Sequence, residues 1–171
     1  MLSRQQIEAL IAGSPPLIEG LLNPADQLQA NGVDITLDSV SRFIGAGALG
    51  LTNDQRVLPS TETLPFEHDG QLALPPGAYQ VRFNESVNLP TWLMAYARPR
   101  SSLLRSAVAL HTAVWDAGYS GRGVSLMVVY NPLGFRLARN ARICQLVFHT
   151  LGDITTHAYA GAYQGEGRPS S

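Results

Sequence analysis

Hydrophobic and polar positions alternate along several short segments of the chain, the pattern typical of half-buried β-strands. The alternation is clearest over residues 33–38 and 79–83, and a nearly continuous apolar run over 92–97 predicts a buried strand. Residues 123–130 and 141–150 are predicted as two further strands. Many short strands separated by Gly/Pro turns, with few helices, predict a mainly β protein with a jelly-roll or β-barrel fold.

Two short helices interrupt this pattern. A helix is predicted over residues 3–12, where Ser3 and Gln6 form a capping-box pattern ahead of an apolar stripe. A second helix is predicted to start at one of the two serines after Pro99 and to run to about Val108. The elements therefore predict a β domain with a short N-terminal helix and one short internal helix.

The length of 171 residues favours a single domain, which we place at residues 1–160. Residues 161–171 have too little apolar content to pack alone. They are predicted to form a flexible tail, or an arm that becomes ordered over a bound ligand at the active site.

Charge narrows the possible partners. The formal net charge of −1 does not favour nucleic acid or an acidic membrane as a partner. Only 15% of the residues are charged, which suggests that some surface is buried between subunits. All 12 basic residues are arginines. The lack of lysine excludes Schiff-base chemistry and a Walker-type phosphate lysine, so arginine, backbone N–H groups, hydroxyls or a metal would have to hold any phosphate.

Cys144 is the only cysteine, so an intrachain disulfide or a cysteine zinc site is excluded. It lies in an apolar run and is predicted to be a buried small residue. The chain has no apolar run of about 18 residues and no signal-peptide pattern at its start, so we expect a cytoplasmic protein.

The segment from Arg100 to Arg105 is a candidate phosphate site. A helix N-terminus attracts anions, and Ser101 and Arg105, four positions apart, would share one helix face; Ser102 adds a second hydroxyl. The alternative is an ordinary capped helix with two solvated arginines.

Asp116 is the candidate catalytic residue. Apolar residues precede it, and Gly118 and Gly121 permit a tight turn, where a carboxylate could accept a proton from a water attacking phosphorus. The alternative is an aspartate that caps its own turn. Tyr119 could pack flat on a sugar ring and exclude a 2′-hydroxyl, or could be a core aromatic.

Two further residues, His111 and Thr112, lie in a predicted hairpin or tight loop over residues 109–121. Their backbone groups could read a pyrimidine edge, although a lone histidine is more often structural. Asp34 lies on the polar face of its strand, where it is expected to be solvated; the alternative is a place near the site. The remaining histidines are scattered and indicate no metal cluster.

Taken together, these segments resemble the superfamily of trimeric dUTP pyrophosphatases and dCTP deaminases, and most closely the archaeal-type dUTPases. The motifs that carry the resemblance are, in chain order, Gly32-Val33-Asp34-Ile35-Thr36-Leu37, Pro99-Arg100-Ser101-Ser102-Leu103-Leu104-Arg105, Thr112-Ala113-Val114-Trp115-Asp116-Ala117-Gly118-Tyr119-Ser120-Gly121, Val128-Val129-Tyr130-Asn131-Pro132, Ala141-Arg142-Ile143-Cys144-Gln145-Leu146-Val147-Phe148 and Tyr163-Gln164-Gly165.

The resemblance implies a distorted jelly roll, a homotrimer with its sites at subunit boundaries, and Mg²⁺ held mainly by the triphosphate rather than by the protein. It implies hydrolysis of dUTP to dUMP and pyrophosphate, with Asp116 activating water for attack on the α-phosphorus and Tyr119 stacking on deoxyribose. The remaining residues that it implies contact substrate are Arg100, Ser101, Ser102 and Arg105, which bind phosphates from a neighbouring subunit, together with Gln145, Tyr163 and Gln164.

Two other functions remain as alternatives. One is a dCTP deaminase, alone or combined with dUTP hydrolysis. Deaminases of this family carry a glutamate three residues before an asparagine, where this chain has Val128 before Asn131, and valine cannot shuttle the proton that deamination needs. The other alternative is a trimeric module that binds nucleotide without turnover.

Overall fold

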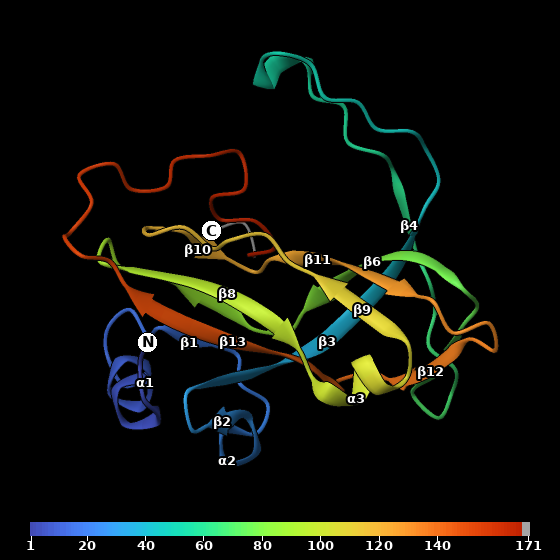
Figure 1. The fold of residues 1–171 in the computed structure, drawn as a ribbon, viewed down its shortest axis with the longest axis horizontal. Helices are drawn as coiled ribbons and strands as arrows, with labels where there is room; N and C mark the ends of the chain where they lie inside the picture. The colour runs from blue at the N-terminus through green and yellow to red at the C-terminus, as the bar shows by residue number, and fades with distance from the viewer. Residues whose placement is uncertain (169–171) are drawn as a thin grey trace.

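The structure, a computed structural model, describes residues 1–168 and is organised around one large, strongly curved sheet (Figure 1). Its main strands, in hydrogen-bonded order, are β8 (Leu93–Pro99), β13 (Arg142–Thr150), β3 (Gly32–Phe43), β6 (Gly77–Phe83), β11 (Val124–Val129) and β9 (Val108–His111). Two shorter strands, β2 (Leu28–Gln29) and β4 (Thr61–Thr63), also pair with β3. The expected mainly β architecture is confirmed.

Two small sheets and short helices complete the fold. One sheet joins β1 (Ile18–Glu19), β7 (Ser86–Asn88) and β10 (Ser120–Gly121), and the other joins β5 (Gln71–Leu74) and β12 (Phe135–Ala138). The helices are α1 (Arg4–Ile11), α2 (Pro24–Gln27), α3 (Ser101–Arg105) and the 3₁₀ turn η1 (Asn53–Gln55).

The apolar residues that alternate along the strands meet inside the curved sheet. On β8 and β13, Ala95 faces Phe148 and Ala97 faces Leu146, and all four are at most 5% exposed. Val81 of β6 and Met127 of β11 are fully buried in the same cluster. For β6, where alternation was predicted over residues 79–83, the period-two pattern indicated the buried face correctly, since Tyr79, Val81 and Phe83 are buried.

The first predicted helix is confirmed with its cap. The Gln6 backbone N–H donates to Ser3 Oγ, and the Ser3 backbone N–H donates to Gln6 Oε1. The second helix is shorter than predicted. It ends at Arg105, because Ala107 adopts a left-handed conformation with φ of 56° before β9 begins. Its cap is Arg100, whose side chain makes no capping hydrogen bond, rather than a serine.

The expectation that Asp34 is solvated is wrong. Asp34 is 3% exposed and Thr36 is 2% exposed, although both occupy the polar positions of β3. The strand is covered on this side by α2 and by the side chains of Arg100 and Arg142, so its polar face is buried against partners. Alternation alone does not reveal such a cover.

The segment between β3 and β4 forms an arm that leaves the body of the molecule and carries η1 near its tip (Figure 1). It exposes several large apolar side chains, with Leu49 83% and Leu51 101% exposed. Its returning half reaches back toward the C-terminal segment, where the Arg56 guanidinium lies 5.3 Å from the centre of the Tyr163 ring.

Candidate active site

A cavity of ≈ 280 Å³ opens where the loop before β10 meets the C-terminal segment and the arm. Its polar and aromatic walls come from Asp116, Tyr119, Tyr159, Tyr163 and Glu166. The remaining walls are formed by Leu58, Gln80, Ala113, Val114, Trp115, Gly123 and Val124. Strands, loop and tail thus contribute to one hollow that contains two carboxylates and several aromatic rings.

The loop that carries Asp116 is fixed by its neighbours. Trp115 forms a two-bond bridge with Ala95 of β8, with N···O distances of 2.8 and 2.9 Å. Gly118 has φ of +88°, a conformation that favours glycine, and its N–H donates to the Leu89 carbonyl at 3.0 Å. The Asp116 carbonyl accepts the Tyr119 N–H at 3.0 Å, which closes the turn.

The Asp116 side chain is exposed and faces the cavity rather than the core. The buried rings and backbone bridges around it hold the loop, so a water molecule could be presented to a carboxylate in a fixed position. The turn therefore places the Asp116 carboxylate at the wall of the cavity. Capping of its own turn by the Asp116 carboxylate is not among the hydrogen bonds of the described residues.

Tyr119 is a core aromatic that is 5% exposed and also lines the cavity, while its contact with a sugar stays a prediction. Its ring meets Tyr159 edge to face, with 5.5 Å between ring centres. Its hydroxyl donates to Glu166 Oε1 at 2.8 Å. Burial, followed by the contact with Glu166, raises the pKa of Tyr119, so the phenol stays protonated and remains a donor.

The C-terminal segment docks on the same loop. The Gln164 side-chain amide donates to the Gly118 carbonyl at 3.0 Å, and its oxygen accepts the Ser120 N–H at 2.9 Å. Tyr163 lines the cavity. Tyr163 therefore shares the cavity with Asp116 and Tyr119, Gln164 binds the backbone beside them, and their contact with substrate stays a prediction. The predicted tail continues to residue 171, and its last three residues lie outside the described residues.

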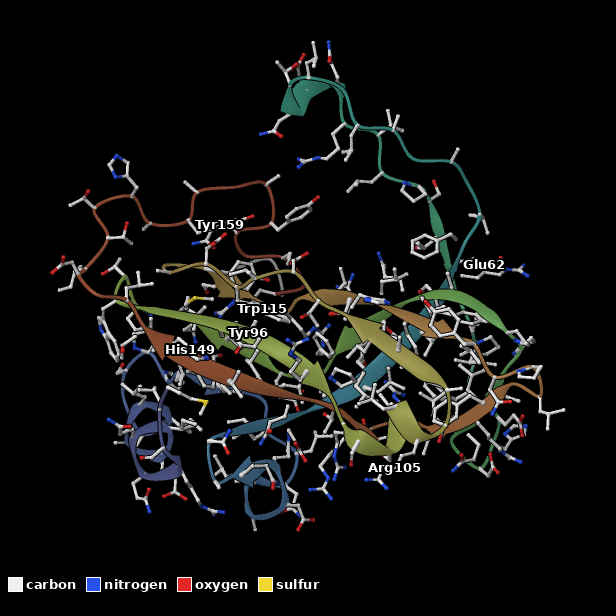
Figure 2. All side chains as sticks on the ribbon, in the orientation of Figure 1. Glu62, Tyr96, Arg105, Trp115, His149 and Tyr159 are labelled. Carbon is white, nitrogen blue, oxygen red and sulfur yellow. The ribbon has the colours of Figure 1, made fainter. Side chains whose placement is uncertain are left out.

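The Arg100–Arg105 segment does not share this cavity. Arg100 follows the end of β8, about 16 Å along the strand from Ala95, the residue that bridges to the Asp116 loop. In Figure 2, Arg105 and Trp115 are well separated in the molecule. Ser101, Ser102 and Arg105 are exposed at the surface of α3. Within one chain, the predicted phosphate site and the predicted base lie apart.

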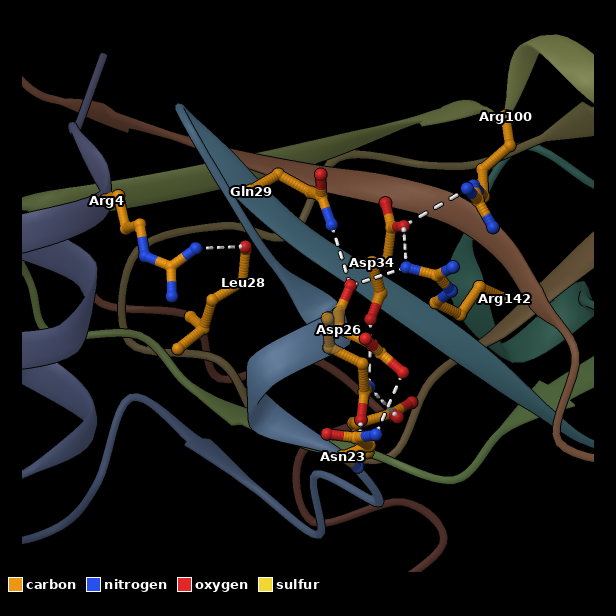
Figure 3. A network of polar contacts seen from close by, with 10 residues as sticks. Arg4, Asn23, Asp26, Leu28, Gln29, Asp34, Arg100 and Arg142 are labelled. Atoms are coloured by element: carbon orange, nitrogen blue, oxygen red, sulfur yellow. Dashed lines mark hydrogen bonds and ion pairs between the residues drawn. The ribbon is translucent and has the colours of Figure 1, made fainter.

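Arg100 and Arg142 hold the buried Asp34 carboxylate between them (Figure 3). Each guanidinium approaches Asp34 Oδ2 at 3.4 Å. Burial raises the pKa of Asp34, while the two arginines lower it. Asp34 thus orients Arg100 at the start of α3, close to the serines of the predicted phosphate site.

The other predicted contacts are distributed over the strands. His111 is exposed at the end of β9 and pairs with Leu126, so it lies in a strand rather than in the predicted hairpin loop. The Thr112 hydroxyl donates to the Ala97 carbonyl at 3.3 Å. Gln145 lies on β13 between Asp34 and Arg98, on the face that also carries Arg100. None of these three lines the cavity around Asp116.

Sequence reasoning missed Glu166, Tyr159 and Leu58 as residues of the cavity. Glu166 is 47 positions from its partner Tyr119, and Leu58 belongs to the arm. No local pattern marks such contacts, because they depend on how the tail and the arm return to the sheet.

The arrangement of His, Cys, Asp and Glu side chains indicates whether the protein alone could hold a metal ion. Over residues 1–168, no group of three or more His, Cys, Asp or Glu side chains is arranged to hold a metal ion. The cavity offers the carboxylates of Asp116 and Glu166. Such a set suits Mg²⁺ that arrives with most of its ligands already supplied by phosphate oxygens and water.

As for membranes, no helix of the described residues has the length and apolarity to cross one.

A family model described as dCTP deaminase-like matches residues 1–151. The chain is 48% identical over 166 residues to a protein of Methanosarcina mazei named probable deoxyuridine 5′-triphosphate nucleotidohydrolase, covering 97% of both chains. A protein of the same name from Archaeoglobus fulgidus is 44% identical over 97% of this chain and 96% of its own.

Among solved structures, a 2′-deoxycytidine 5′-triphosphate deaminase from Agrobacterium tumefaciens has the same fold. Its TM-score is 0.68 at 22% identity, with 88% of this chain and 48% of that chain covered.

Proposed function

Since the chain belongs to the dCTP deaminase-like family, we propose that it hydrolyses dUTP to dUMP and pyrophosphate. The observation that carries the proposal is the cavity in which the exposed Asp116 carboxylate lies beside the buried Tyr119 ring. A carboxylate that can take a proton from water and an aromatic ring that can pack on a sugar are the two groups that this reaction needs in one place. The names of the near-full-length relatives support the choice of dUTP.

In the proposed mechanism, Asp116 orients and deprotonates a water molecule for in-line attack on the α-phosphorus. The ring of Tyr119 packs on the deoxyribose and leaves no room for a 2′-hydroxyl. Main-chain groups of the loop at Ala113 and Val114, both of which line the cavity, read the uracil edge. Donors and acceptors matched to uracil would reject cytosine, because the mismatch leaves buried polar groups unpaired. The carboxylates of Asp116 and Glu166 are the groups of the cavity that could face Mg²⁺, and a bound ion would supply positive charge that offsets the charge of the triphosphate.

The phosphate-binding residues are proposed to come from a second copy of the chain. Within one subunit the cavity that Asp116 faces is lined by none of the four residues Arg100, Ser101, Ser102 and Arg105. A homotrimer in which α3 of one subunit faces the cavity of the next would bring them together. The arginines would then stabilise the negative charge on the triphosphate, and catalysis would rest mainly on positioning and electrostatics.

The test is incubation of the purified protein with dUTP, dCTP, dTTP and UTP in the presence of Mg²⁺, followed by separation of the products. We expect dUMP and pyrophosphate from dUTP, with much slower turnover of the others. Ammonia from dCTP would instead identify a deaminase. Absence of pyrophosphate with every nucleotide would favour binding without turnover.

Arg105→Ala is expected to raise the dissociation constant of a non-hydrolysable dUTP analogue by about tenfold or more, because a charged hydrogen bond to phosphate is lost. Binding of deoxyuridine, which has no phosphates, should change little. Isothermal titration calorimetry measures both. Arg42→Ala, at an exposed arginine of β3 paired with Glu62, is the matched control. Equal weakening of nucleotide and nucleoside would argue against a phosphate role for Arg105.

The deaminase alternative is disfavoured at Val128. This residue lies on β11, opposite Ala78 and Ala109, and neither of these two cross-strand neighbours has a titratable side chain. The chain contains no acidic residue between Asp116 and Phe135 that could replace the missing glutamate.

A further inference from the structure

Backbone hydrogen bonds attach the C-terminal segment to the residues that follow Tyr119. The Gly165 N–H donates to the Ser120 carbonyl at 2.7 Å, and the Arg122 N–H donates to the Glu166 carbonyl at 2.8 Å. Gln164 adds its two side-chain bonds to the backbone of the same loop. Residues 164–166 therefore form part of a turn that packs against the loop.

Within this docked segment, one side chain turns inward. Glu166 is half-buried and lines the cavity, and its Oε1 accepts a hydrogen bond from the Tyr119 hydroxyl with an O···O distance of 2.8 Å. Gly121 leaves the space for this contact, since a Cβ there would lie 2.7 Å from the Tyr119 hydroxyl and 3.2 Å from the Glu166 nitrogen. The contact is thus built by the tail and the loop together.

We propose that Glu166 is a positioning residue that fixes the Tyr119 ring when the tail is docked, and so sets how strongly the site prefers a deoxyribose over a ribose. The inference rests on the proposed function of the cavity. Tyr119 is held at two places, by the edge-to-face contact with the Tyr159 ring and by the hydrogen bond from its hydroxyl to Glu166. A ring that rejects a 2′-hydroxyl by contact does so only if it cannot move away. The hydrogen bond between Glu166 and the Tyr119 hydroxyl therefore makes sugar selectivity depend on whether the tail is docked.

The chain offers variants that separate this role from simple folding of the tail. Glu166→Ala removes the acceptor. Glu166→Gln keeps an oxygen that can accept the Tyr119 hydroxyl but removes the charge. Tyr119→Phe keeps the ring and removes the donor. Glu8→Ala, at an exposed glutamate of α1, is the matched control.

Steady-state kinetics with dUTP and UTP measures sugar selectivity as the ratio of the two kcat/KM values. For Glu166→Ala we expect this ratio to fall about tenfold, with KM for dUTP rising more than kcat falls. Glu166→Gln should retain most of the ratio and Glu8→Ala all of it. Tyr119→Phe should lower the ratio about as much as Glu166→Ala. The double variant should lower it no further than either single variant, since both substitutions remove the same hydrogen bond.

Hydrogen-exchange mass spectrometry of the nucleotide-free protein provides a readout that does not depend on turnover. In Glu166→Ala the amides of Gly165 and Arg122 should exchange about tenfold faster, while Glu166→Gln should stay close to the wild type. Slower turnover with an unchanged dUTP/UTP ratio would overturn the proposal and leave Glu166 a structural role only. Failure of the wild type to hydrolyse dUTP would instead refute the proposed function, and unchanged exchange in Glu166→Ala would refute the anchor itself.

Discussion

Asp116→Asn is expected to lower kcat for dUTP by about 10²–10⁴, the usual contribution of a general base. Asparagine has nearly the shape of aspartate but cannot take a proton from water at neutral pH. The Asp116 side chain is exposed toward the cavity, while its loop is fixed by the Trp115–Ala95 bridge and by Gly118. The substitution should therefore leave the fold and the affinity for a non-hydrolysable dUTP analogue almost unchanged.

Pyrophosphate release under saturating dUTP measures this effect, and calorimetric titration with the analogue measures binding. Asp153→Asn, at an exposed aspartate after β13, is the matched control and should retain full activity. Normal turnover by Asp116→Asn would show that another group activates the water. Loss of analogue binding together with turnover would indicate that the Asp116 carboxylate orders the loop instead.

Glu85→Ala is expected to lower the free energy of unfolding by about 3 kcal/mol or more, because it leaves several buried donors without an acceptor. Glu85 is 2% exposed. Its carboxyl oxygens accept the Thr36 N–H at 2.9 Å, the Thr36 hydroxyl at 2.6 Å and the Gln27 amide at 2.6 Å. Burial raises the pKa of Glu85, and the bonds from Thr36 and Gln27 oppose that shift. The side chain thus ties α2, β3 and the start of β7 together.

Urea denaturation followed by circular dichroism measures the change. Glu62→Ala, which removes an exposed carboxylate paired with Arg42, is the matched control and should lower the free energy of unfolding by less than about 1 kcal/mol. If Glu85→Ala lowered the free energy of unfolding no more than Glu62→Ala, water or a rearrangement would have to satisfy the donors that lose their acceptor.

The elements predicted from local patterns are largely those of the structure. The capping box at Ser3 and the alternation over β6 depend on residues a few positions apart, and both are confirmed. The predicted end of the second helix was wrong, because the left-handed conformation of Ala107 has no marker in that stretch of sequence. Short elements such as α2, β5 and β12 were not predicted, since so few residues establish no period.

The candidate site was predicted in part for the same reason. Asp116 and Tyr119 share one turn and could be grouped from their spacing alone. Their grouping with Gln164 came from the resemblance, and the structure places all three together. Glu166 was missed because its contact with Tyr119 spans 47 positions, and Asp34 was misplaced because the arginines that cover it follow much later in the chain.

By itself, the sequence determined the mainly β fold, the family and the short loop that carries both the carboxylate and the ring, because each follows from residues close together in the chain. Only the tertiary structure decided that the tail anchors Tyr119 through Glu166, that Arg100 is engaged by a buried Asp34, and that the arginine–serine helix lies apart from Asp116 in one subunit. The physical reason is that these relations depend on how distant strands and the tail return to one another, and short-range periodicity carries no information about such returns.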